Sequence, residues 1–187
     1  GEVSRSTTYF PSNKIARLES LLSELISNEY RRCILYGAFR ATIDKLIDVA
    51  IRSGWSVISV DGRGWRGFPD LVGTPQQLYE LFQSSSDDPI AIIGHPASLG
   101  EGLTLPCEHI IFYSNDFNPK TRQQAEARSR NKKVNIYDIL HLPCDKQVLD
   151  RLRQGSDLQR VSMGELMKWM AVDDAGLIKP QGELNSI

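Results

Sequence analysis

Two patterns of apolar and polar residues alternate along the chain from residue 13 to about residue 140. Short apolar runs bounded by turn residues predict five buried strands, at residues 33–36, 56–60, 90–93, 110–113 and 134–138. Between them, apolar residues that recur every three or four positions predict helices over residues 13–28, 41–52 and about 74–81. Strands that alternate with helices predict an α/β domain, a mostly parallel sheet covered on both faces.

Turn and cap residues mark the ends of these elements. Gly54 is placed to end the second helix as a left-handed C′ residue, and Pro75 stands at the first helical position of the third helix. The glycine-rich run 61–67 is predicted to be a loop after the second strand.

The pattern also divides the chain. Residues 1–12 are predicted to be a flexible N-terminus, 13–142 the α/β domain, 143–172 a helical extension and 173–187 a polar tail.

Composition narrows the possible classes of protein. The 187 residues can bury a sizeable core, and the net charge of −1 leaves any nucleic-acid surface to a local patch. Three scattered cysteines and three histidines lack the spacing of metal ligands, so we expect reduced thiols, an intracellular protein and no metal site. No apolar run is long enough to span a membrane, and a start at Gly-Glu without Met suggests an excised fragment.

The chemistry concentrates in residues 94–131. Gly100 and Gly102 flank Glu101, and such glycines let backbone N–H groups approach a phosphate, with Ser98 and Thr104 as hydroxyl donors. Glu101 would repel a phosphate if it pointed inward, or could face away and orient an arginine; the sequence leaves both open.

After the next strand, Asn118-Pro119 closes a turn and opens a helix. Gln124 and Arg128 stand four apart and are predicted to share one face of it, an arrangement suited to an anion, and to phosphate in particular. The alternative for Arg128 is a surface ion pair with Glu126 or Asp138.

At these residues the chain resembles a known family. The run ASLGEGLTL followed by YSNDFNPKTRQQAEARSR resembles motifs V and VI of superfamily 2 helicases, specifically the Swi/Snf-like DNA translocases. Asp116, Asn118 and Pro119 match the family's turn, and Gln124, Ala125 and Arg128 match its Q-A-x-x-R pattern. More weakly, CILYGAFRATIDKL resembles motif IV, and the likeness covers only the second, C-terminal RecA-like lobe. The resemblance therefore implies a three-layer RecA-like domain with about five or six strands, followed by C-terminal helices.

The resemblance also implies roles. ATP would sit between this lobe and an N-terminal lobe that carries the phosphate loop and the Mg²⁺ ligands, because no G-x-x-x-x-G-K-[ST] loop occurs here. The implied ATP-binding residues are Gly100, Glu101, Gly102, Gln124 and Arg128, and the implied catalytic residues are Arg128, Gln124 and Arg130. Asn131 stands where the family has its second arginine, and Arg130 is the nearest substitute.

The implied nucleic-acid contacts are Arg40, Arg63, Arg66, Ser98 and Thr104, with a solvated loop as the alternative for the Arg63–Arg66 segment. We therefore expect the second motor lobe of an ATP-dependent DNA helicase or translocase, with RNA left open as the substrate. The protein is expected to be intracellular, either nuclear or in the cytoplasm or nucleoid, and the isolated chain is expected to be inactive. One alternative is a nucleic-acid-binding or scaffolding domain with the same fold and no turnover. Another is an unrelated α/β nucleotide-binding or transferase domain.

Overall fold

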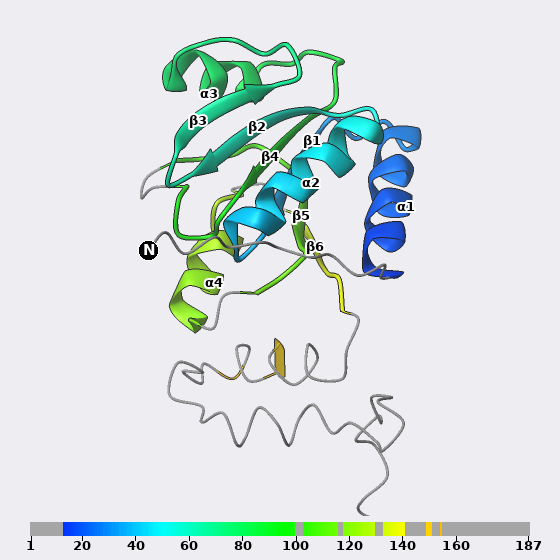
Figure 1. Ribbon diagram of the computed structural model, residues 1–187, viewed down its shortest axis with the longest axis vertical. Helices are drawn as coiled ribbons and strands as arrows, with labels where there is room; N and C mark the ends of the chain where they lie inside the picture. The colour runs from blue at the N-terminus through cyan, green and yellow to red at the C-terminus, as the bar shows by residue number, and fades with distance from the viewer. Residues whose placement is uncertain are drawn as a thin grey trace, which may run out of the picture.

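The computed structural model describes residues 13–99, 103–115, 118–129 and 133–140, together with 149, 150 and 154. In this part of the chain a single sheet runs in the order β3-β2-β4-β1-β5-β6 (Figure 1). The strands are β1 (Arg32–Tyr36), β2 (Ser56–Asp61), β3 (Gly64–Phe68), β4 (Ile90–Gly94), β5 (His109–Phe112) and β6 (Asn135–Asp138). Every pairing is parallel except that of β2 with β3.

Helices cover both faces of this sheet. They are α1 (Asn13–Ser27), α2 (Arg40–Arg52), α3 (Pro75–Gln83) and α4 (Pro119–Glu126). Cys33 and Leu35 of β1 pack in the core under α1 and α2, whereas Ile34 and Tyr36 pack in the core on the side of α3 and α4. Figure 1 shows α1 and α2 together on one side of the sheet. The predicted three-layer α/β fold with a mostly parallel sheet is confirmed.

Two predicted helix ends are also confirmed. Gly54 follows α2 with a φ of 88°, and the amides of Gly54 and Trp55 bond the carbonyls of Ile51 and Ala50, which is a Schellman motif. Thr74 caps α3 in a capping box with Gln77, and Pro75 is the first helical residue.

The predicted loop over residues 61–67 is wrong. Its second half is β3, which pairs antiparallel with β2 through a two-residue turn at Gly62-Arg63. The glycines gave a turn signal, but the alternation of Trp65 and Arg66 fits an edge strand once β2 is beside it.

Several predictions fall on residues that the structure does not describe. These are the N-terminus at 1–12, most of the helical extension at 143–172 and the tail at 173–187, and the domain boundaries stay predictions. Among the described residues, no helix has the length and apolar character that crossing a membrane requires.

Candidate nucleotide and nucleic-acid site

The parallel strands β1, β2 and β4 end at the same edge of the sheet, where ligand sites of α/β folds usually lie. A pocket of about 360 Å³ opens there, which we call the carboxyl-edge pocket. It brings together two of the predicted nucleic-acid contacts, Arg40 and Ser98, and its lining also includes Phe39, Asp61, Gly62 and His95.

Arg40 is exposed at the first turn of α2, beside the end of β2. A Cβ added to Gly62 would lie 3.0 Å from Nη2 of Arg40, so the bare glycine backbone leaves room for the guanidinium. Within the described residues Arg40 makes no hydrogen bond or ion pair, so its donors face solvent and can take an anion.

Arg63 and Arg66 are held differently. Arg63 bonds Asp61 and also pairs with Asp44 of α2 at 2.6 Å, while Arg66 reaches Asp61 at 3.3 Å. The hydrogen bond from Arg63 lowers the pKa of Asp61 and overcomes the effect of burial. The two cations and two carboxylates sum to zero charge, so this hairpin attracts phosphate less than its sequence suggests.

The remaining residues predicted to contact nucleic acid or ATP either do not gather at the carboxyl-edge pocket or lie outside the described residues. The carbonyl of Thr104 accepts hydrogen bonds from Tyr79 and Gln83 of α3, and Thr104 does not line the carboxyl-edge pocket. Gly100, Glu101 and Gly102 lie outside the described residues, and so does Arg130.

The predicted helix of motif VI is shorter than its sequence indicates. The helix α4 ends at Glu126, so Arg128 lies in the turn beyond it and does not share a helical face with Gln124. Gln124 is exposed, whereas Arg128 is half-buried with its Nε enclosed and without a partner. The predicted alignment of the two side chains along one helix is therefore wrong, although both remain candidates for the nucleotide.

The two carboxylates that the sequence offered as ion-pair partners of Arg128, those of Glu126 and Asp138, form ion pairs with Arg122. Arg122 bonds Asp138 through Nη1 at 2.6 Å and Nη2 at 3.0 Å, and Glu126 through Nε at 2.5 Å. Its guanidinium also lies 3.5 Å from the ring centroid of Phe112. Burial lowers the pKa of Arg122, but the bonds to Asp138 and Glu126 outweigh it and the pKa rises.

The ion-paired alternative for Arg128 is therefore wrong among the described residues. The i,i+4 spacing of Arg122 and Glu126 was a visible signal for the true pair, while the reach to Asp138 needed the tertiary structure.

The loop after motif V and the turn of motif VI are joined directly. The amide of Leu105 donates to the carbonyl of Arg128 at 3.0 Å, and the hydroxyl of Ser129 donates to the carbonyl of Cys107 at 2.5 Å. Arg128 also lies near Tyr36, where it partly opposes the rise that burial causes in the pKa of that phenol. Two hydrogen bonds thus fix the turn that carries Arg128 to the segment that precedes β5.

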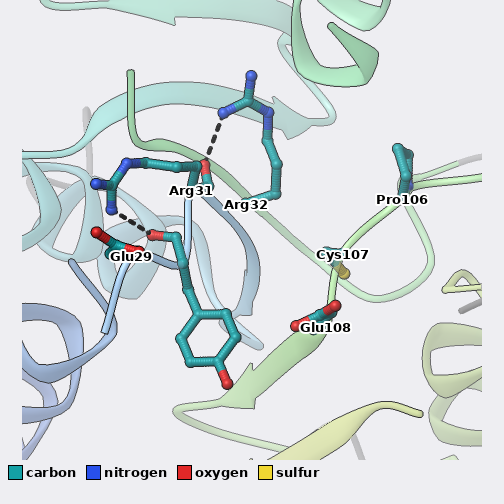
Figure 2. A pocket seen from close by; sticks show the side chains of 7 residues that line it. Glu29, Arg31, Arg32, Pro106, Cys107 and Glu108 are labelled. Carbon is teal, nitrogen blue, oxygen red and sulfur yellow. Dashed lines mark hydrogen bonds between the residues drawn. The ribbon is translucent and has the colours of Figure 1, made fainter. Parts of the chain in front are cut away.

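A second pocket, of about 270 Å³, opens at the opposite edge of the sheet (Figure 2). Its cations are already used: Arg31 donates to the carbonyl of Ile26, and Arg32 donates to carbonyls at the end of α3 such as Phe82. Burial raises the pKa of the Cys107 thiol to about 11, which makes it a poor nucleophile. The described residues hold no group of three histidine, cysteine or acidic side chains arranged for a metal.

The sheet order and the helices on both faces define a RecA-like α/β lobe, with Arg40 and Ser98 at the carboxyl edge of the sheet and the Arg128 turn bonded to the segment that precedes β5. No family model matches the chain. It is 28% identical over 177 residues to the chromatin-remodeling ATPase INO80 of Mycosarcoma maydis, covering 91% of this chain and 9% of that protein. It is 25% identical over 167 residues to the helicase SWR1 of Debaryomyces hansenii, covering 86% and 10%.

The fold matches a crystal structure of the C-terminal part of the Fun30 ATPase domain, with a TM-score of 0.59 and 24% identity over 73% of this chain and 44% of that one. These similarities confirm the resemblance to a Swi/Snf-like C-terminal lobe. They also remove the alternative of an unrelated transferase or nucleotide-binding domain. The chain spans about a tenth of the length of the two ATPases it is compared with.

Proposed function

We propose that this chain is the second motor lobe of an intracellular ATP-dependent DNA translocase or helicase. Arg128 and Gln124, with Arg130, complete the ATP site from across a cleft whose other wall is an N-terminal lobe. Arg40 and Ser98 grip the nucleic-acid backbone, with smaller contributions from Arg63, Arg66 and Thr104. The similarity to ATPases described as chromatin-remodeling supports DNA and a nuclear location.

One observation carries this proposal. The guanidinium of Arg128 has no hydrogen-bond or ion-pair partner among the described residues, and the carboxylates of Glu126 and Asp138 are bonded by Arg122. Because Arg122 occupies both carboxylates, Arg128 keeps its full positive charge for an anion. That donor set fits a nucleotide phosphate.

In this proposal the residues of the chain have simple tasks. ATP supplies the phosphoryl group, and the N-terminal lobe supplies the Mg²⁺ ligands. Arg128 stabilises negative charge that grows at the phosphate oxygens, Gln124 orients Arg128 or a water molecule, and the bond from Leu105 to Arg128 holds the turn in place. Opening and closing of the cleft would move the grip along the strand.

The test is ATP hydrolysis by the complete protein that carries this chain, with and without duplex DNA. We expect Arg128→Ala to lower the DNA-stimulated kcat by about 10³-fold or more, as for other arginine fingers. Arg52→Ala is the matched control, because Arg52 is exposed on α2 and, in the part of the chain that the structure describes, forms an ion pair only with Glu19. Stimulation that survives in the Arg128 variant would move the finger to Arg130 or elsewhere.

The second candidate is a nucleic-acid-binding or scaffolding domain that has lost turnover. The net charge of −1 does not decide it, but Asn131 at the position of the second arginine favours it. Absence of hydrolysis in the wild type, with DNA binding intact, would select this candidate.

A further inference from the structure

Phe39 is an exposed aromatic residue in a position where a polar one is expected. It is the N-cap of α2, makes no side-chain cap and is 64% exposed. Ser, Thr, Asn and Asp are favoured at N-caps because their side chains satisfy a free amide of the first turn, which phenylalanine cannot do. Among the described residues Phe39 makes no aromatic or cation–π contact, so its exposed ring is available to a ligand.

The ring is mounted on a rigid backbone. The carbonyl of Phe39 accepts from Ile43 at 2.9 Å, and the preceding amide, of Ala38, donates to the hydroxyl of Ser114 at 2.9 Å. One residue earlier, the amide of Gly37 donates to the carbonyl of Gly94 at 3.1 Å. A group held this firmly loses little conformational freedom when it binds a ligand.

The ring lies beside polar side chains that can donate hydrogen bonds to a phosphate. Phe39 lines the carboxyl-edge pocket beside Arg40, whose guanidinium has no partner among the described residues. Across the pocket, Nδ1 of His95 accepts a hydrogen bond from the amide of Ala97, so the ring proton of the neutral imidazole sits on Nε2 as a donor. A pocket of about 360 Å³ is within the range that small ligands fill.

We propose that the carboxyl-edge pocket takes one nucleotide of a nucleic-acid strand, with the base stacked on Phe39 and the phosphate bound by Arg40. This rests on the proposed function and deepens it, because it gives the lobe a contact with bases as well as with the backbone. A flat aromatic ring stacks on any base, so the contact does not depend on sequence. It requires a base that is not stacked inside a duplex, so the pocket prefers strands with unpaired bases.

The test compares a single-stranded oligothymidylate with a duplex of the same length, bound to the complete protein and followed by fluorescence anisotropy. We expect Phe39→Ala to weaken single-strand binding by roughly 5- to 150-fold, as stacking contacts do. Phe39→Trp should preserve it, and the salt dependence should not change in either variant. Val72→Ala is the matched control, because Val72 is 97% exposed and does not line the pocket.

Arg40→Ala separates the two parts of the proposal. It should weaken binding of both nucleic acids and reduce the slope of log Kd against log salt by about 0.7 for the single strand. If Arg40→Ala has this effect and Phe39→Ala has none, the stacking contact is wrong while the backbone grip stands. If Phe39→Ala abolishes ATP hydrolysis and leaves nucleic-acid affinity unchanged, the ring covers the other lobe and the stacking contact is wrong. Failure of the wild type to bind either nucleic acid would overturn the proposed function itself.

Discussion

At the scale of single residues, Arg122 shows how one side chain can fix a site without touching a ligand. Its guanidinium is 6% exposed and joins α4 to Asp138 at the end of β6 and to Asn115 after β5. Arg128 lies two residues after the end of α4, so the contacts that fix α4 through Arg122 also help to position Arg128.

We expect Arg122→Ala to lower the free energy of unfolding by about 3–5 kcal/mol, because it removes the buried cation that pairs with the enclosed carboxylate of Asp138. Urea denaturation of the chain would measure this. Arg52→Ala, which breaks an exposed pair with Glu19, should change it by less than about 1 kcal/mol. Equal effects in the two variants would show that the Arg122 cluster contributes little.

At the scale of elements, β5 and β6 meet the turn that follows α1 through a group of three rings. His109 of β5 stacks on Tyr137 of β6 with ring centroids 5.8 Å apart, and meets the edge of Tyr30 at 4.1 Å. Its Nδ1 lies 3.2 Å from the hydroxyl of Tyr137, and its Nε2 is buried with no hydrogen-bond partner among the residues that the structure describes. Burial lowers the pKa of His109, although the charge of Glu108 opposes this.

This lowered pKa predicts a stability that depends on pH. The unfolded chain binds the histidine proton at a higher pH than the folded chain does, so the contribution is complete above about pH 6.5 and is lost as the pH falls through the unfolded value toward the folded one. Thermal melts from about pH 7.5 to about pH 5.5 should show this loss in the wild type. His109→Phe keeps a ring between Tyr30 and Tyr137 and should remove the component; an unchanged profile would assign it to another group.

At the scale of the whole molecule, the lobe holds only half of the site we propose. Arg40 stands at the amino end of α2 in the carboxyl-edge pocket, whereas Gln124 lies in the last turn of α4 and Arg128 just beyond it. The printed sequence lacks a phosphate loop, and the chain covers about a tenth of each ATPase it resembles.

We therefore expect the isolated chain to show no ATP hydrolysis above background, with or without duplex DNA, because one wall of the cleft cannot position a nucleotide for attack. A phosphate-release assay on the purified chain, with the complete protein as the positive control, would check this. Turnover that co-purifies with the chain and disappears in Arg128→Ala would contradict the prediction.

The sequence by itself determined five of the six strands in the described part of the chain, the main helices and their order. Apolar periodicity is a local property, and it reports which side of an element faces the core. It predicted the α/β fold with a sheet covered on both faces. Residue types favoured at helix ends predicted the cap at Gly54 and the start of α3 at Pro75, and the structure confirms all three.

Only the tertiary structure decided which polar groups meet. In the structure the second half of a glycine-rich run is a strand, Asp61 forms an ion pair with Arg63, and Asp138 forms an ion pair with Arg122 and not with Arg128. Such pairings depend on distances between elements that are far apart in the chain, and on which competing cation is nearer. Sequence spacing carries that information only within one helix, as for Arg122 and Glu126.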